Sequence, residues 1–132
     1  MRVSELMHTH VEAVRRDDLL PAVVQTMADQ HVTALAVVDK PNRIIGVIST
    51  TDVLVAQAES SSGPDDWKLM TVEDVMSAPA FTVSPDASIA EAAQQLLYAD
   101  VHRLFVEGNG ELVGVISQTD LVRALAAHRL SR

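Results

Sequence analysis

Cysteine is absent from this sequence of 132 residues, which excludes a disulfide framework, a thiolate metal site and a cysteine nucleophile. No apolar run approaches the length that spans a bilayer, and residues 1–5 lack the apolar core of a signal peptide. We therefore expect a cytoplasmic protein with no membrane partner.

Basic residues are scarce beside acidic ones: 10 Lys and Arg stand against 18 Asp and Glu, for a net charge of −8. Such a surface repels a phosphate backbone, so nucleic acid is excluded as a general partner. A bound nucleotide would need a local basic cluster. The apolar content of 48% is ample for the core of a domain this size.

An internal repeat organises the chain. Residues 46–52 read GVISTTD, and residues 114–120 read GVISQTD. The openings at 3–7 and 72–76 correspond as well, since both have Val first and Met last. The repeat thus covers nearly all of the sequence, and its length holds one supersecondary unit per copy. We predict a first unit at 1–58, a surface linker at 59–70 and a second unit at 71–132.

Hydrophobic patterning predicts the order β-α-β-β-α in each copy, and therefore a mixed α/β fold. Short extended segments at 11–15 and 81–83 each precede a helix, and two strands joined by a turn follow. The last helices span about 50–58 and 118–129. The helical periodicity predicts these core positions: Leu20, Val23, Val24 and Met27 in the first copy; Ile89, Ala92, Ala93 and Leu96 in the second.

The repeated motif falls at a strand-to-helix junction, where free backbone N–H groups suit an anionic or hydroxyl-rich ligand. Two interpretations of its aspartates, Asp52 and Asp120, stay open. Each has capping-box spacing from the serine three residues before it. Each could instead accept both hydroxyls of a ribose diol, with Thr51 or Thr119 beside it.

A β-α-β-β-α unit that runs from Val-x-x-x-Met to Gly-hydrophobic-hydrophobic-Ser-x-Thr-Asp resembles the CBS domain, named after cystathionine β-synthase. Two copies resemble a CBS pair, or Bateman module. The resemblance implies a pseudo-two-fold pair of units with clefts for adenosyl compounds: AMP, ADP or ATP first, S-adenosylmethionine or NAD(H) second. It also implies that Asp52 with Thr51, and Asp120 with Thr119, hold ribose.

The two copies differ where the resemblance implies a phosphate contact. The second has His102 and Arg103 before its hairpin, and Arg123 one helical turn after the motif. The first has Thr33-Ala34 and Val55 at these places. We predict that the second copy binds phosphate better than the first. The alternative is that both arginines are ordinary solvated charges.

The sequence shows no catalytic constellation. His8 and His10 lack a third metal ligand, no serine-histidine-carboxylate triad is evident, and no P-loop is present. We therefore predict no enzyme, no metal and no required cofactor. Trp67, which ends the linker, is predicted to pack against the adjoining helix.

The predicted function is a regulatory module that senses an adenine nucleotide and signals to an unidentified partner protein. The alternative is a dimerisation or assembly module that binds no ligand. A homodimer is expected because the last helix of each copy keeps a second apolar face: Val55 and Ala58; Leu121, Val122 and Leu125.

Overall fold

The computed structural model describes residues 1–60, 63 and 65–130, the last three as backbone only. It divides into two compact units. One comprises Glu12–Ala80, and we call it the 12–80 unit. The other joins Met1–Val11 to Phe81–Arg132, and we call it the split unit.

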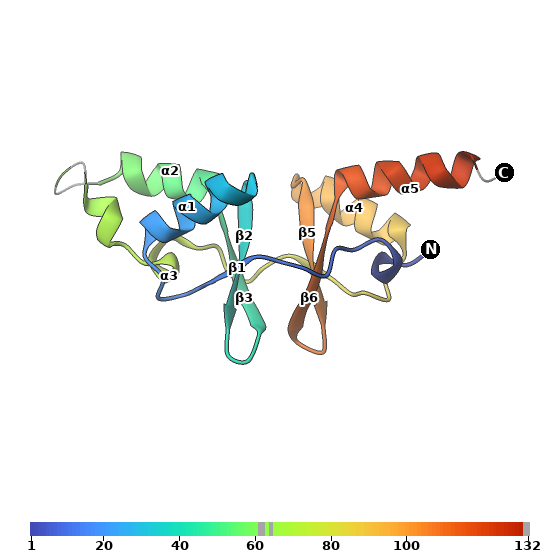
Figure 1. Cartoon of the computed structure of the whole chain (residues 1–132), viewed down its shortest axis with the longest axis horizontal. Helices are drawn as coiled ribbons and strands as arrows, with labels where there is room; N and C mark the ends of the chain where they lie inside the picture. Colours follow the sequence, from blue (N-terminus) through green and yellow to red (C-terminus); the bar gives the residue numbers. More distant parts are fainter. Residues whose placement is uncertain (61–62, 64, 131–132) are drawn as a thin grey trace. The chain divides into compact units, whose positions relative to one another are not determined.

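The 12–80 unit contains three strands together with helices (Figure 1). Strand β1 pairs parallel to β2, and β2 pairs antiparallel to β3. Its elements are β1 (Ala13–Arg15), α1 (Leu20–Gln30), β2 (Ala34–Asp39), β3 (Arg43–Ser49), α2 (Thr50–Ala58), the 3₁₀ turn η2 (Asp66–Leu69) and α3 (Val72–Val75).

The split unit repeats this plan, with β4 parallel to β5 and β5 antiparallel to β6. Its elements are the 3₁₀ turn η1 (Val3–Glu5), β4 (Thr82–Val83), α4 (Ile89–Ala99), β5 (Arg103–Gly108), β6 (Glu111–Ser117) and α5 (Gln118–Leu130). The predicted order β-α-β-β-α and the mixed α/β class are therefore confirmed.

Each unit has its own core, built largely from the predicted helix positions. Leu20, Val23 and Met27 of α1 are buried with residues of β2, β3 and α2. In α4, Ala92 and Leu96 are buried, while Ile89 and Ala93 pack beside them. The apolar periodicity thus identified the face that each helix turns to its sheet.

Two apolar residues were assigned to the wrong environment. Val24 is 36% exposed, at the rim of its helix face and outside the core. Leu121, expected on a free face of α5, is 6% exposed and belongs to the core of the split unit. Both errors arise because apolarity alone does not fix where a helix face ends.

The compact units do not coincide with the sequence repeats. Residues 1–11 open the first repeat, yet they pack with the second, and residues 71–80 open the second repeat yet pack with the first. In each opening a helical turn precedes Met7 or Met76. The following residue then pairs through its backbone with a motif strand: His8 with Val115, and Ser77 with Val47.

The linker contributes structure to the 12–80 unit. Residues 66–69 form η2, and the partly buried Trp67 packs against that unit's hydrophobic core. This confirms the packing interpretation of the indole. Among the described residues, no helix is both long enough and apolar enough to cross a bilayer.

Candidate functional site

Both motif aspartates cap the helix that they open. In the 12–80 unit the N–H of Ser49 donates to Asp52 Oδ2 at 2.8 Å, and the N–H of Asp52 donates to Ser49 Oγ at 3.1 Å. In the split unit the corresponding distances between Ser117 and Asp120 are 2.8 and 3.2 Å. The reciprocal capping box predicted from the spacing is therefore present in both copies.

A glycine opens each motif because backbone from the repeat openings lies directly over it. A Cβ on Gly46 would lie 2.6 Å from the carbonyl oxygen of Ser77. A Cβ on Gly114 would lie 2.9 Å from the carbonyl oxygen of His8 and 2.7 Å from Met7 Sδ. All three distances are shorter than van der Waals contact, so each opening can lie this close to its motif only where glycine is present.

The two aspartates differ in their second oxygen. Asp120 Oδ1 lies 2.9 Å from Nε2 of His8, and the Asp120 side chain is only 8% exposed. Asp52 is half-buried, and among the described residues its side-chain hydrogen bond is that of the capping box. The place of His8 is taken there by Ser77, which is exposed. The split unit therefore covers its carboxylate, whereas the 12–80 unit leaves one oxygen of Asp52 available.

Electrostatics favour the ionised form of Asp120. Burial raises the pKa of this carboxyl, but the hydrogen bonds from Ser117 and His8 outweigh burial, and the net pKa is lowered. Hydrogen bonds to a carboxylate stabilise its charged form, which is the cause of the shift. The charged form is also the one that would accept the hydroxyls of a diol.

The candidate phosphate contacts are brought to the start of α5. Arg103 is half-buried and lies opposite Ser117 in the β5–β6 ladder. The carbonyl oxygen of His102 accepts the N–H of Gln118 at 2.9 Å. Arg123 is exposed on α5, one turn after Asp120. Neither arginine forms an ion pair with another described residue.

The equivalent place in the 12–80 unit is uncharged. The carbonyl oxygen of Thr33 accepts the N–H of Thr50 at 2.9 Å, in the same manner as His102 and Gln118. Ala34 lies opposite Ser49. Val55, at the place of Arg123, is 46% exposed. The sequence difference between the copies therefore places basic residues near the start of α5 and uncharged residues near the equivalent start of α2.

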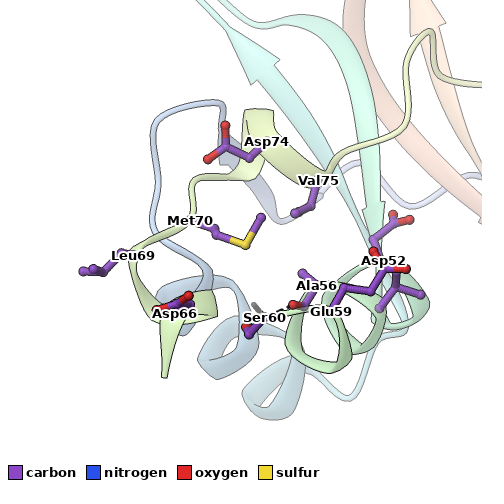
Figure 2. Close-up of a pocket in the computed structure, with 10 residues that line it drawn as sticks. Asp52, Ala56, Glu59, Ser60, Asp66, Leu69, Met70, Asp74 and Val75 are labelled. Carbon is purple, nitrogen blue, oxygen red and sulfur yellow. Dashed lines mark hydrogen bonds between the residues drawn. The ribbon is translucent and has the colours of Figure 1, made fainter. Parts of the chain in front are cut away.

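A cavity of about 670 Å³ lies beside Asp52 in the 12–80 unit. Figure 2 shows Asp52 at one end, α2 along one side, and η2 and α3 opposite. Among the described residues, its lining includes carboxylates and apolar side chains but no Lys, Arg or His: Asp52, Val55, Ala56, Glu59, Ser60, Asp66, Leu69, Met70, Asp74 and Val75. A phosphate would meet like charge here.

Sequence reasoning missed this cavity and the contact between His8 and Asp120. The repeat itself contained a signal for the contact of His8 with Asp120. Aligning the two copies matches His8 to Ser77, each directly after the repeated Met. In the part of the chain that the structure describes, no cluster of three or more His, Asp and Glu side chains is arranged to hold a metal ion.

Two β-α-β-β-α units, each with a Thr-Asp pair at a strand-to-helix junction, define a tandem-repeat module. The CBS domain family model matches residues 3–59 and 72–127. The chain therefore belongs to the CBS domain family, with two copies of the domain.

Known relatives and structures agree with this assignment. An uncharacterized protein of Methanopyrus kandleri is 25% identical over 85% of the chain, which spans 60% of that protein. CBSX2 is a CBS-pair protein of Arabidopsis thaliana. Its crystal structure in complex with AMP matches this chain with a TM-score of 0.83 at 25% identity. That match covers 99% of this chain and 98% of the other.

The fold is shared at lower identity too. A CBS domain-containing protein of unknown function from Bacillus anthracis has a TM-score of 0.86 at 20% identity, over 96% of this chain and 94% of the other.

Proposed function

We propose that this protein binds an adenine nucleotide and acts as a regulatory module rather than as an enzyme. The observation that carries the proposal is the likeness to CBSX2, whose structure contains AMP and matches nearly the whole chain. Both Thr-Asp pairs lie at helix starts, where Thr51 and Thr119 are exposed. The ribose diol is the proposed partner of Asp52 and Asp120.

The start of α5 is the proposed phosphate-binding place. The carbonyl of His102 accepts the N–H of Gln118, and Arg103 pairs with Ser117 in the sheet. Arg123 is exposed on the same helix. Asp52 instead borders a cavity without basic lining residues. AMP, ADP and ATP are therefore assigned to the split unit first. A ligand without phosphate suits the 12–80 unit better, because its carboxylates repel anions.

We propose that nucleotide binding is signalled to a partner protein through the segments that the bound nucleotide would order. Residues after Met7 and Met76 pair with the motif strands, and His8 also contacts Asp120. A ligand that contacts these segments would change the stability of the unit containing them. By linkage, a partner that prefers one state would then bind with altered affinity.

A thermal-shift panel with AMP, ATP, S-adenosylmethionine and NADH tests the proposal. A ligand specific for the folded state raises the melting temperature by mass action, by an amount that grows with its concentration. We expect AMP or ATP to give the largest rise. Melting temperatures that none of the four compounds changes at millimolar concentration would contradict the proposal.

The second candidate function is an assembly module that binds no nucleotide. It is favoured by the finding that both aspartates already serve their own helices as capping residues. Under this alternative the ligand panel is silent, while substitutions on the exposed apolar helix faces change the oligomeric state.

A further inference from the structure

His8 and Ser77 hold equivalent places in the two units. Each follows the repeated Met, and each exchanges two backbone hydrogen bonds of 2.9 Å with a motif strand. The side chains then differ in reach. The imidazole of His8 extends to Asp120 Oδ1 at 2.9 Å. Ser77 and Asp52, both within the described residues, are not joined by such a bond.

The oxygen that His8 occupies is the one that a diol would need. Asp120 Oδ2 already accepts the N–H of Ser117 at 2.8 Å, which is required for the helix cap. Oδ1 is therefore the oxygen left for a ligand hydroxyl, and His8 holds it in the structure. Asp120 is only 8% exposed and its Oδ1 is in contact with the imidazole, so a ribose hydroxyl has to compete with His8 for this oxygen.

We infer that His8 is a gate on the ribose-binding carboxylate of the split unit, and that the 12–80 unit has no such gate. The inference rests on the proposed function, in which Asp120 and Asp52 hold ribose. The side chain of His8 is 63% exposed, so it can turn away into solvent without disturbing a core. A ribose diol opens this gate by replacing the imidazole at Oδ1.

The gate makes the two units unequal towards the same nucleoside. Opening it breaks a hydrogen bond to a carboxylate, which is among the stronger hydrogen bonds in proteins. Removing the imidazole should therefore tighten nucleoside binding at Asp120 by about 10-fold. Placing an imidazole at residue 77 should weaken binding at Asp52 by a similar factor.

Carboxyl footprinting of the full chain, read by mass spectrometry, measures both aspartates separately. Labelling of Asp120 and Asp52 is followed without ligand and then during titration with adenosine, which has no phosphate to add a second interaction. The variants are His8→Ala, Ser77→His and the control His10→Ala, whose exposed imidazole lies two residues from the gate. Circular dichroism establishes that each variant is folded.

Without ligand, we expect His8→Ala to raise the labelling of Asp120 and Ser77→His to lower that of Asp52, with no change in the control. With adenosine, half-protection of Asp120 should require about 10-fold less ligand in His8→Ala than in the wild type. Ser77→His should require about 10-fold more at Asp52.

Two results would overturn the gate. One is unchanged labelling of Asp120 in His8→Ala. The other is weaker protection by adenosine in that variant, which would make His8 a ligand contact instead. If the labelling changes as expected but adenosine protects neither aspartate in any variant, ribose binding fails while the covering of Asp120 by His8 stands.

Discussion

At the scale of single residues, Asp52 and Asp120 share one motif but not one environment. Each caps its helix through the same pair of hydrogen bonds. The surroundings of the remaining oxygen differ, with an imidazole at Asp120 and a cavity at Asp52. A carboxylate can serve as a cap and as a ligand group together, because its two oxygens offer about four acceptor positions.

Arg103 provides the test of phosphate binding. Arg103→Ala should weaken AMP and ATP by about 1.5–3 kcal/mol, the scale of a charged hydrogen bond, and leave adenosine almost unchanged. Arg103→Lys should recover part of the loss, because an ammonium lacks the guanidinium fork. Calorimetry with AMP and adenosine in parallel measures both. Equal weakening of the two ligands would mean that Arg103 shapes the pocket and does not read phosphate.

Asp120 also predicts a pH dependence of stability. Its folded-state pKa is lowered from 3.8, since the hydrogen bonds from Ser117 and His8 outweigh burial. A lowered pKa stabilises the fold above the unfolded value, and this contribution is lost as pH falls through the folded value. Asp120→Asn should therefore cost about 1–2 kcal/mol at pH 7. The difference from wild type should shrink as pH falls below 3.8.

Urea unfolding at neutral and acid pH measures this difference. Asp65→Asn is a suitable control, because Asp65 is 77% exposed and its ion pair within the described part of the chain is with Lys68. An exposed pair contributes little to stability. A cost of Asp120→Asn that is the same at both pH values would contradict the assignment of the shift to the folded state.

At the scale of elements, the crossing of each repeat opening over its motif glycine makes a prediction about packing. Gly46→Ala would place a Cβ 2.6 Å from the carbonyl oxygen of Ser77, and Gly114→Ala would place one 2.9 Å from that of His8. Backbone cannot yield as a flexible side chain can, so each change should cost about 1–3 kcal/mol.

Denaturant midpoints provide the measurement, with Gly108→Ala as the matched control. A Cβ at Gly108 would meet its nearest neighbour, Pro85, at an ordinary 3.5 Å. Its cost should stay within the few tenths of a kcal/mol usual for sites without special constraint. Midpoints of Gly46→Ala and Gly114→Ala that match the control would show that the openings are not held tightly over the motifs.

Much of the element order was predictable from the sequence, because each copy supplies an independent reading of one pattern. Strands, helices and capping boxes follow from local periodicity and spacing. The helical openings at 3–5 and 72–75 and the exchange of residues 1–11 and 71–80 were not predicted. Both features depend on backbone pairing between residues far apart in the sequence. The repeat hides this pairing, because each opening could equally pair with the motif of its own copy.

The candidate site was predictable only in part for the same reason. Thr51, Asp52, Thr119 and Asp120 follow from the motif, and the place of Arg103 opposite Ser117 follows from the hairpin. The contact of His8 with Asp120 joins residues 112 positions apart. They come together only because the opening of the first repeat pairs with the motif strand of the second.

At the scale of the whole molecule, exposed apolar residues on α2 and α5 predict self-association. Leu54 and Val55 are 61% and 46% exposed, and Val122 and Leu125 are 63% and 62% exposed. Surfaces of this kind usually mark interfaces, and homo-oligomers with two-fold symmetry are the commonest assemblies. We expect a homodimer at micromolar concentration in sedimentation velocity, and Val122→Lys should weaken it.

Leu97→Lys on α4 provides the control, since Leu97 is 78% exposed on a different helix. It should leave the sedimentation coefficient unchanged if α2 and α5 form the interface. A wild-type monomer at micromolar concentration would refute the dimer, and dissociation by Leu97→Lys alone would move the interface to α4.

The exchanged openings also determine where this chain can be divided. A cut within residues 59–65 yields an amino-terminal piece that carries residues 1–11, which belong with the split unit. The carboxy-terminal piece carries residues 71–80, which belong with the 12–80 unit. Neither piece holds a complete core, yet each supplies what the other lacks. The two pieces therefore have the properties required of complementing fragments. Recovery of the fold on mixing them would show that they have reassociated.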